Sequence, residues 1–202
     1  MKKISDNDLA SKIVENDMAT VGETASLLKN LGVDEGYFLE RGMVRFDDVA
    51  VTGDELVVVQ VDDDGREHEL VAGAAMAWRM MMDAASVDGC ELLMVSAYRS
   101  VERQSEIVRG KFLRGQGAEE IFAVSAPPGF SEHHTGRAVD ISTPEYAALE
   151  EEFERSAAFG WLGENAGRFG FTMTYGRGNA YGFLYEPWHW VFGVGESVKE
   201  KG

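Results

Sequence analysis

The placement of histidine constrains this chain more than any other feature of its sequence. The chain has four histidines, and three of them fall in two short segments, SEHHTGRAVD (131–140) and EPWHW (186–190). Each segment runs into a short stretch of β-branched or aromatic residues, AVDIS (138–142) and WHWVF (188–192), which is typical of a strand. We therefore expect two strands that carry polar side chains into an apolar core.

Alternation along these strands predicts which side chains meet. Successive residues of a strand point to opposite faces, so Asp140 lies on the face away from Val139 and Ile141. A buried aspartate between small neighbours needs a partner for its charge. In the second strand, His189 lies opposite the bulky face formed by Trp188, Trp190 and Phe192. The aromatic face is expected in the core, which leaves His189 to point at Asp140 across a sheet.

Two histidines and an aspartate, supplied by two strands and the loop before one of them, are typical of a catalytic zinc site with one open position. Glu186 lies three residues before His189, where its carboxylate could take a proton from a metal-activated water during attack on a carbonyl. Each segment alone also fits a structural role: a packed core histidine beside tryptophans, or a capped turn at SEHHTG. The two segments together favour the metal site.

Composition indicates a globular protein and excludes several classes of partner. The apolar fraction is 45%, and 19 Lys+Arg against 35 Asp+Glu give a formal net charge of −16. This charge repels phosphate groups and anionic membranes, so we expect no nucleic-acid partner. The longest apolar run, Val71–Trp78, is too short to span a bilayer, and no apolar signal segment follows Lys2 and Lys3. As written, the chain is expected to be a cytoplasmic monomer.

The charge is unevenly distributed, because residues 1–70 carry a net charge of −10 and residues 71–202 a net charge of −6. We therefore expect an acidic N-terminal accessory region, 1–70, and a catalytic domain, 71–202. The first is predicted to contain two helices and two strands, at Asp6–Glu15, Thr20–Leu31, Val44–Val51 and Glu55–Val61. The Asp62–Gly65 turn lacks the alternating ligands of a calcium loop, so a solvated hairpin turn is favoured.

Helical and strand periodicity continue through the second part of the chain. We predict a methionine-rich helix over Ala72–Ser86, and its methionine stripe should face the core. A buried strand follows this helix. Ser100 is predicted to cap the next helix. The remaining predicted elements are the strand Glu91–Ser96, the helix Ser100–Arg114, and helices within Pro144–Phe159 and around Glu164–Phe169. Cys90 is the only cysteine, which excludes an internal disulfide and a cysteine metal cluster.

Three separated motifs resemble those of one enzyme family. They are Ser131-x-His133-x-x-Gly136-x-Ala138-x-Asp140, Glu186-x-x-His189, and Ser96-Ala97-Tyr98-Arg99-Ser100 with Gln104. In this order the motifs resemble the VanY-type D-alanyl-D-alanine carboxypeptidase family of zinc peptidases, over about residues 71–194. The resemblance implies an α+β fold of the Hedgehog/DD-peptidase type, an antiparallel sheet flanked by helices with zinc on its face.

The resemblance also implies roles for individual residues. One zinc ion per chain would be held by His133, Asp140 and His189, with Glu186 as general base. Arg99 would stabilise the oxyanion of the tetrahedral intermediate or grip the substrate carboxylate. His134 takes a position that is often held by a polar residue that is not a ligand. The substrate peptide would contact Ser131, Gln104, Tyr98 and Trp188.

The expected function is that of a zinc metallopeptidase that hydrolyses peptidoglycan stem peptides next to a D-amino acid, most simply a D-alanyl-D-alanine carboxypeptidase. An L,D-carboxypeptidase and a lysin-like L-alanyl-D-glutamate endopeptidase stay open, since that choice is expected to depend on the loops Gly115–Phe130 and Gly176–Leu184. A non-catalytic zinc-containing binding module is the alternative of another class. It would need neither Glu186 nor Arg99. Without a signal segment, action on the cell wall would require release or another export route.

A serine-enzyme interpretation of the same activity is not supported. Ser26-Leu27-Leu28-Lys29 is an S-x-x-K sequence and Ser5-Asp6-Asn7 spells SDN, but their order is reversed and no K-T-G sequence occurs. We expect Ser26 and Lys29 to be ordinary helix residues. Cys90 has no histidine at a recognisable spacing, which also disfavours a thiol protease.

Overall fold

Two antiparallel sheets organise the chain, which the computed structural model describes over residues 21–30 and 32–193. A hairpin joins β1 (Leu56–Val61) to β2 (Glu67–Val71). A four-stranded sheet has the order β3-β4-β6-β5, with all neighbours antiparallel. Its strands are β3 (Leu93–Ser96), β4 (Ala138–Ser142), β5 (Phe171–Met173) and β6 (His189–Phe192). The predicted α+β fold with an antiparallel sheet flanked by helices is confirmed.

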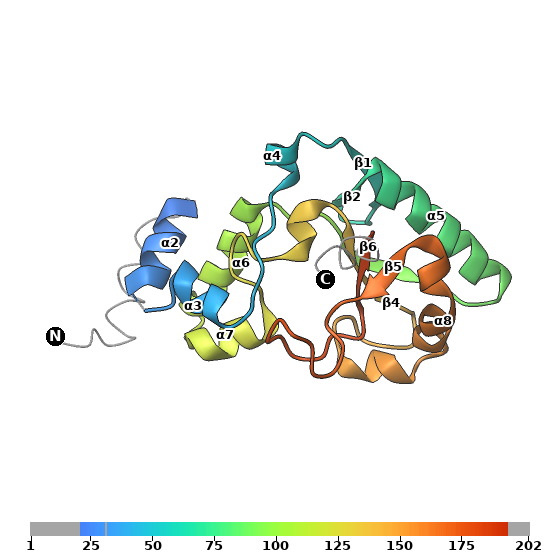
Figure 1. Cartoon of the computed structure of the whole chain (residues 1–202). Helices are drawn as coiled ribbons and strands as arrows, with labels where there is room; N and C mark the ends of the chain where they lie inside the picture. Colours follow the sequence, from blue (N-terminus) through green and yellow to red (C-terminus); the bar gives the residue numbers. More distant parts are fainter. Residues whose placement is uncertain (1–20, 31, 194–202) are drawn as a thin grey trace, which may run out of the picture.

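Helices lie on both sides of this sheet (Figure 1). The α-helices are α2 (Val21–Asn30), α3 (Glu35–Glu40), α4 (Val49–Thr52), α5 (Ala72–Val87), α6 (Val101–Leu113), α7 (Ala118–Val124) and α8 (Ala157–Asn165). Three 3-10 helices, η1 (Glu132–Thr135), η2 (Glu151–Arg155) and η3 (Ala166–Phe169), complete the described elements. Within the described ranges, none of the helices has the length and apolar character needed to cross a membrane.

The first hydrophobic core forms where α5 packs against the sheet and the hairpin. Residues spaced three and four apart bury one face of α5: Ala74, Ala75, Trp78, Met81 and Ala85. The ring of Trp78 meets Phe171 of β5 edge-on, with centroids 6.5 Å apart. The methionine stripe is only partly in the core, because Met76 and Met80 fall on the opposite face and are 65% and 56% exposed.

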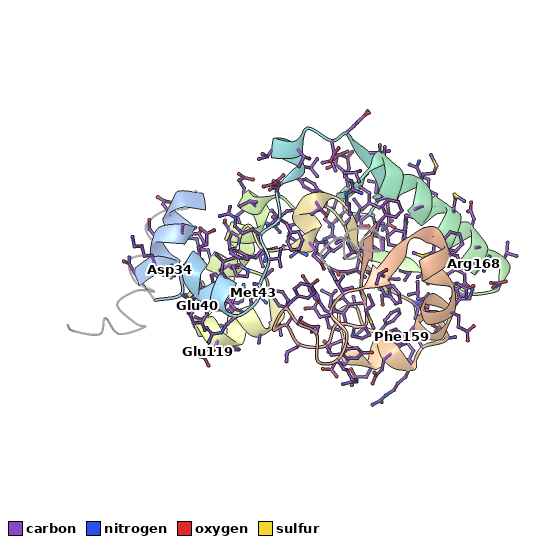
Figure 2. All side chains as sticks on the ribbon, viewed as in Figure 1. Asp34, Glu40, Met43, Glu119, Phe159 and Arg168 are labelled. Atoms are coloured by element: carbon purple, nitrogen blue, oxygen red, sulfur yellow. The ribbon has the colours of Figure 1, made fainter. Side chains whose placement is uncertain are left out.

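The second core lies between the N-terminal helices and the α6–α7 pair, at the other end of the molecule (Figures 1 and 2). Phe38 of α3 packs against Phe122 of α7, with ring centroids 4.8 Å apart. Met43 belongs to this core, as do Tyr175 and Phe183 from the C-terminal third of the chain. The described part of residues 1–70 thus shares one core with the four-stranded sheet and the other with α6 and α7. The division at residue 70 stays a prediction.

Several predicted elements are confirmed with small changes at their ends. These are α2, α5, α6, β1, β3, β4 and β6. Ser100 caps α6 by accepting a hydrogen bond from the Arg103 amide, 3.1 Å. Ser26 lies within α2 and bonds to the Gly22 carbonyl, as expected for an ordinary helix residue. The helix predicted over Asp6–Glu15 and the SDN sequence lie outside the described residues.

The strand predicted over Val44–Val51 is wrong. The chain there is irregular and then forms α4, because Asp48 caps this short helix and accepts a hydrogen bond from the Ala50 amide. The same carboxylate accepts hydrogen bonds from the Tyr98 hydroxyl and the Val101 amide, both 2.8 Å. These contacts join α4 to the segment that enters α6, some 50 residues away. The β propensity of residues 44–51 could not predict such long-range contacts.

The helices predicted within Pro144–Phe159 and around Glu164–Phe169 are displaced. The structure instead has η2, then α8 capped by Ser156, then η3. The elements β2, β5, α3 and α7 were not predicted. The Asp62–Gly65 turn is a hairpin turn, in which Asp62 accepts hydrogen bonds from Gln60 and Arg66.

Candidate active site

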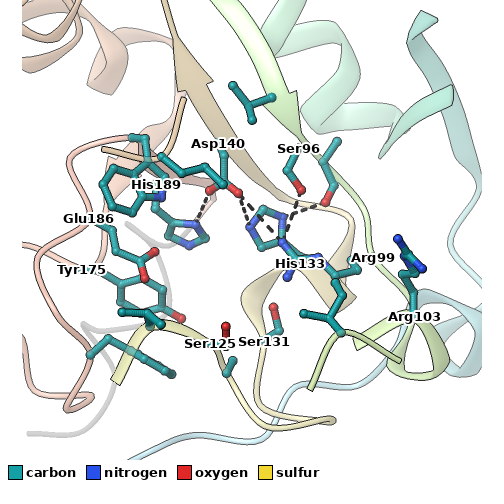
Figure 3. Close-up of a pocket in the computed structure, with 18 of the residues that line it drawn as sticks. Ser96, Arg99, Arg103, Ser125, Ser131, His133, Asp140, Tyr175, Glu186 and His189 are labelled. Atoms are coloured by element: carbon teal, nitrogen blue, oxygen red, sulfur yellow. Dashed lines mark hydrogen bonds and ion pairs between the residues drawn. The ribbon is translucent and has the colours of Figure 1, made fainter. Parts of the chain in front are cut away.

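The pairing of β4 with β6 brings the site together. Asp140 stands opposite His189 in the register, and Asp140 Oδ1 lies 3.0 Å from His189 Nδ1. His133 enters from η1, with its Nε2 3.2 Å from Asp140 Oδ2. The three side chains are buried, and one ligand atom from each lies within 4.8 Å of the others. The prediction that His189 points at Asp140 across the sheet is confirmed (Figure 3).

Each histidine of this cluster is oriented through its outer nitrogen. His133 Nδ1 donates to the Ala97 carbonyl, 2.7 Å, which leaves Nε2 facing Asp140. His189 Nε2 donates to Glu132 Oε2, 2.9 Å, which leaves Nδ1 facing Asp140. Glu132 is itself held by the Thr174 hydroxyl, 2.6 Å. Outer hydrogen bonds of this kind commonly fix the tautomer and direction of metal-binding histidines.

The electrostatics of the cluster favour a cation. Burial would lower the pKa of His189, but hydrogen bonds to Asp140 and Glu132 outweigh it and raise this pKa to about 10. Burial would raise the pKa of Asp140, yet His133 and His189 hold it well below its usual range. Two buried carboxylates thus stabilise positive charge at one imidazole. The donor set of two nitrogens and a carboxylate suits Zn²⁺.

His134 has a different environment from its neighbour. Its Nδ1 donates to the Arg99 carbonyl, 2.6 Å, and its Nε2 accepts the Gly129 amide, 3.1 Å. Both ring nitrogens therefore bind backbone, and burial lowers the pKa of this histidine. The structure brings His133, and not His134, to Asp140.

Glu186 lies at the turn that leads into β6, as its spacing from His189 predicted. The His189 amide donates to the Glu186 carbonyl, 3.1 Å, and the Glu186 amide donates to the Tyr175 carbonyl, 3.0 Å. The Glu186 side chain lines the same cleft as the histidine cluster. Burial, reinforced by the charge of Asp140, raises the pKa of Glu186 to about 7, although His189 opposes the shift. A carboxylate with this pKa is suited to take and return a proton near neutral pH.

Arg99 reaches the cluster from the loop after β3. Its Nη2 lies 3.9 Å from Asp140 Oδ2 and 3.3 Å from the Ser96 hydroxyl. Its Nη1 donates to Gln104 Oε1, 2.7 Å. Gln104 is completely buried and also bonds to the Ala126 carbonyl. Gln104 is absent from the cleft lining, and its bonds hold it against Arg99 and the Ala126 carbonyl. Its contact with substrate stays a prediction.

The cleft has a volume of about 730 Å³ and collects the other predicted residues. Ser131, Tyr98 and Trp188 line it. The Tyr98 hydroxyl is already bonded to Asp48. The loops proposed to determine specificity reach the cleft through Ser125 and Leu184, among others.

Two residues of the site were missed by sequence reasoning. Glu132 adjoins His133 in the motif, so a carboxylate next to a predicted ligand was an available signal. Tyr175 stacks on His189, with ring centroids 4.5 Å apart and planes 10° apart. Nothing in the sequence around Tyr175 indicated this contact, because the Gly176–Gly182 stretch reads as a plain loop.

Comparison with known proteins agrees with this geometry. A family model described as VanY, D-alanyl-D-alanine carboxypeptidase, matches residues 67–196. The Bacillus subtilis protein YodJ is 39% identical over 119 residues, and a D-alanyl-D-alanine carboxypeptidase of Enterococcus faecalis is 35% identical over 122 residues. These matches cover 57% and 55% of this chain but 43% and 44% of the two proteins. The chain thus spans less than half the length of these curated relatives.

Solved structures show the same fold. The LD-carboxypeptidase LdcB is 35% identical with a TM-score of 0.60, over 68% of this chain and 67% of that one. The D,D-pentapeptidase VanY from a VanB-type resistance cassette, solved in complex with Zn(II), is 28% identical with a TM-score of 0.56, over 74% of this chain and 85% of that one. The predicted Hedgehog/DD-peptidase type of fold is confirmed. Since the family match includes the strands, the histidine cluster and the Glu186 turn, the chain belongs to the VanY D-alanyl-D-alanine carboxypeptidase family.

Proposed function

We propose that this chain is a zinc-dependent peptidase that hydrolyses peptidoglycan stem peptides next to a D-amino acid, most simply by releasing a C-terminal D-alanine. The observation that carries the proposal is the buried cluster of His133, Asp140 and His189 in one cleft with Glu186 and Arg99. The zinc-bound VanY structure and the enterococcal relative named as a D-alanyl-D-alanine carboxypeptidase support the same chemistry.

We assign one zinc ion per chain to His133, Asp140 and His189. When bound there, zinc polarises the scissile carbonyl and lowers the pKa of a water molecule. The residues of the chain then orient the reactants. His133 Nδ1 stays bonded to the Ala97 carbonyl and His189 Nε2 to Glu132, so both ligand nitrogens hold their direction.

Glu186 acts as the proton carrier. Its carboxylate takes a proton from the attacking water as the oxygen–carbon bond forms, and delivers it to the leaving amine as the carbon–nitrogen bond breaks. Arg99, held by Gln104, provides positive charge for the carbonyl oxygen as it becomes negative, or for the free carboxylate of the peptide. Ser131, Tyr98 and Trp188 are assigned to the walls that contact the peptide.

A second candidate activity is that of an L,D-carboxypeptidase, which the likeness to LdcB favours. An L-alanyl-D-glutamate endopeptidase would use the same groups on a different bond. A non-catalytic zinc module is less well supported, because it needs neither a proton carrier with a pKa of about 7 nor an arginine in the cleft.

Incubation of the zinc-loaded protein with purified muropeptides, followed by mass spectrometry, tests the proposal. Loss of one terminal D-alanine from pentapeptides is expected for a D,D-carboxypeptidase. Loss of alanine from tetrapeptides alone would transfer the assignment to the L,D activity. Intact peptides despite bound zinc would favour the binding module.

A further inference from the structure

One basic side chain of the cleft differs from the others in its partners. Four Lys and Arg residues line the cleft: Arg66, Arg99, Arg103 and Lys111. The three arginines each have a carboxylate within 4.0 Å, at 2.8 Å for Arg66, 3.9 Å for Arg99 and 2.7 Å for Arg103. Over residues 21–30 and 32–193, no carboxylate lies that close to Lys111. Its Nζ donates instead to the Ser125 hydroxyl, 2.5 Å.

Lys111 lies in the last turn of α6, whereas Arg99 lies just before the helix begins. Arg103, Ile107 and Lys111 are four residues apart and share the face of α6 that borders the cleft. Lys111 lies seven residues beyond Gln104, the residue that holds Arg99, which is about 10 Å along the helix at a rise of about 1.5 Å per residue. Figure 3 shows the Ser125 and Ser131 side chains directed into the cleft, toward the histidine cluster.

The surroundings of this ammonium group suit an anion. Lys111 is half-buried, and burial together with the charges of Arg114 and Arg99 lowers its pKa, although the charges of Glu186 and Glu120 oppose the shift. An ammonium has three donors, and Ser125 accounts for one of them. A carboxylate would meet both the remaining donors and the local excess of positive charge. The chain as a whole, with a net charge of −16, would repel the same group.

We propose that Lys111 and Ser125 bind a carboxylate of the substrate that lies away from the scissile bond. This inference rests on the proposed function and specifies its substrate class: stem peptides with a free carboxylate besides the terminal one. About 10 Å corresponds to roughly three residues of extended peptide at about 3.3 Å per residue. In a stem pentapeptide, the γ-linked D-glutamate with its free α-carboxylate lies three residues before the terminal D-alanine that leaves, which matches this spacing.

Two synthetic stem pentapeptides test the assignment, one with the D-glutamate α-carboxylate free and one with it as the carboxamide. Lys111→Gln should raise KM for the carboxylate peptide about ten- to a hundredfold. It should leave KM for the carboxamide peptide and both kcat values nearly unchanged. Ser125→Ala should give a smaller change in the same direction. Arg114→Gln is the matched control, because it removes a neighbouring charge that lies outside the cleft lining, and it should not discriminate between the peptides.

Three outcomes would overturn the assignment. An equal rise in KM for both peptides would show that Lys111 does not bind the D-glutamate α-carboxylate. A loss that vanishes only when the C-terminal carboxylate is amidated would assign Lys111 to the terminal group. Equal Kd values for the carboxylate peptide in the zinc-loaded Glu186→Gln variant with and without Lys111→Gln, measured by calorimetry, would exclude any contact. The Kd comparison does not require turnover, so the proposed function can fail while this inference stands.

Discussion

The cleft has two walls with opposite physical character. The sheet wall, formed by β4, β6 and η1, carries His133, Asp140 and His189, which are at most 4% exposed. The helix wall, formed by α6 and the loop before it, carries Arg99 and Arg103, whose side chains are 21% and 65% exposed. Buried side chains whose remaining polar atoms are hydrogen-bonded keep one geometry. Partly exposed charged side chains can change their conformation when a ligand binds. We infer that the sheet wall holds the metal, whereas the helix wall binds charged groups of the substrate and, through Arg99, the carbonyl oxygen that becomes negative.

Removal of a ligand from the sheet wall should have the largest effect. His133→Ala or His189→Ala is expected to abolish zinc binding and hydrolysis, because two remaining ligands hold zinc poorly. Elemental analysis of purified, zinc-reconstituted protein measures this. His134→Ala is the control, since that ring binds only backbone, and it should keep one zinc per chain. The reverse result for the two neighbouring histidines would show that the ligand is wrongly assigned.

Glu186→Gln should give the next largest loss. The amide keeps the size of the side chain but cannot accept a proton, so turnover of a D-alanine-terminated peptide should fall about 10²–10⁴-fold, roughly 3–5 kcal/mol of barrier. Zinc content should not change. Hydrolysis that is indifferent to this substitution would exclude Glu186 as the base.

The pH dependence of the wild type tests the same residue. A base must be deprotonated, so kcat/KM should fall as the pH drops through the pKa of Glu186. Burial raises that pKa to about 7, and a bound cation nearby lowers it, so the midpoint should lie at or below about 7. Glu186→Gln should remove this acidic limb from the residual rate.

Arg99→Ala should reduce turnover about 10²-fold with zinc retained, because it removes positive charge from the position of the developing oxyanion. Gln104→Ala should give a smaller decrease, since Gln104 acts through Arg99. Comparison of kcat and KM for the two variants measures the difference. If Gln104→Ala were as damaging as Arg99→Ala, Gln104 would have a role beyond orientation.

Glu132→Gln tests the support behind the sheet wall. The amide is a poorer acceptor for His189 Nε2 than the carboxylate, so zinc affinity should fall about 10–100-fold. Competition with a fluorescent chelator measures it without reference to activity. Glu120→Gln, which changes an exposed carboxylate on α7, should leave the affinity unchanged. Unaltered affinity in Glu132→Gln would mean that the Glu132 carboxylate is not needed to orient the ring.

Phe38→Ala should have the smallest effect on the chemistry but a large one on stability. Phe38 is 1% exposed in the second core, and its truncation should cost about 3–5 kcal/mol of unfolding free energy. Denaturant unfolding measures this loss. Zinc content should persist below the unfolding transition, because the ring contacts of Phe38 are with Tyr37, Phe122 and Phe130, which lie outside the sheet wall. Loss of zinc from the folded variant would show that the N-terminal helices help to form the metal site.

Much of the sheet wall could be predicted from the sequence. The strands β4 and β6 are short apolar stretches whose alternation specifies which residues share a face, and the motif spacing identified the three clustered residues. The helices α5 and α6 also follow from apolar spacing and the Ser100 cap. These features are local, so each short window of sequence contains the information that determines it.

Only the tertiary structure decided the contacts between distant segments. The α4 region folds as a helix rather than a strand because Asp48 bonds to Tyr98 and Val101, about 50 residues away. Glu132 orients His189 across 57 residues, and Lys111 meets Ser125 from a neighbouring segment. No regular spacing along the sequence indicates which of these distant residues will meet. Their energy depends on burial and on the exclusion of other partners, which arise only once α6, the sheet and the N-terminal helices have packed together.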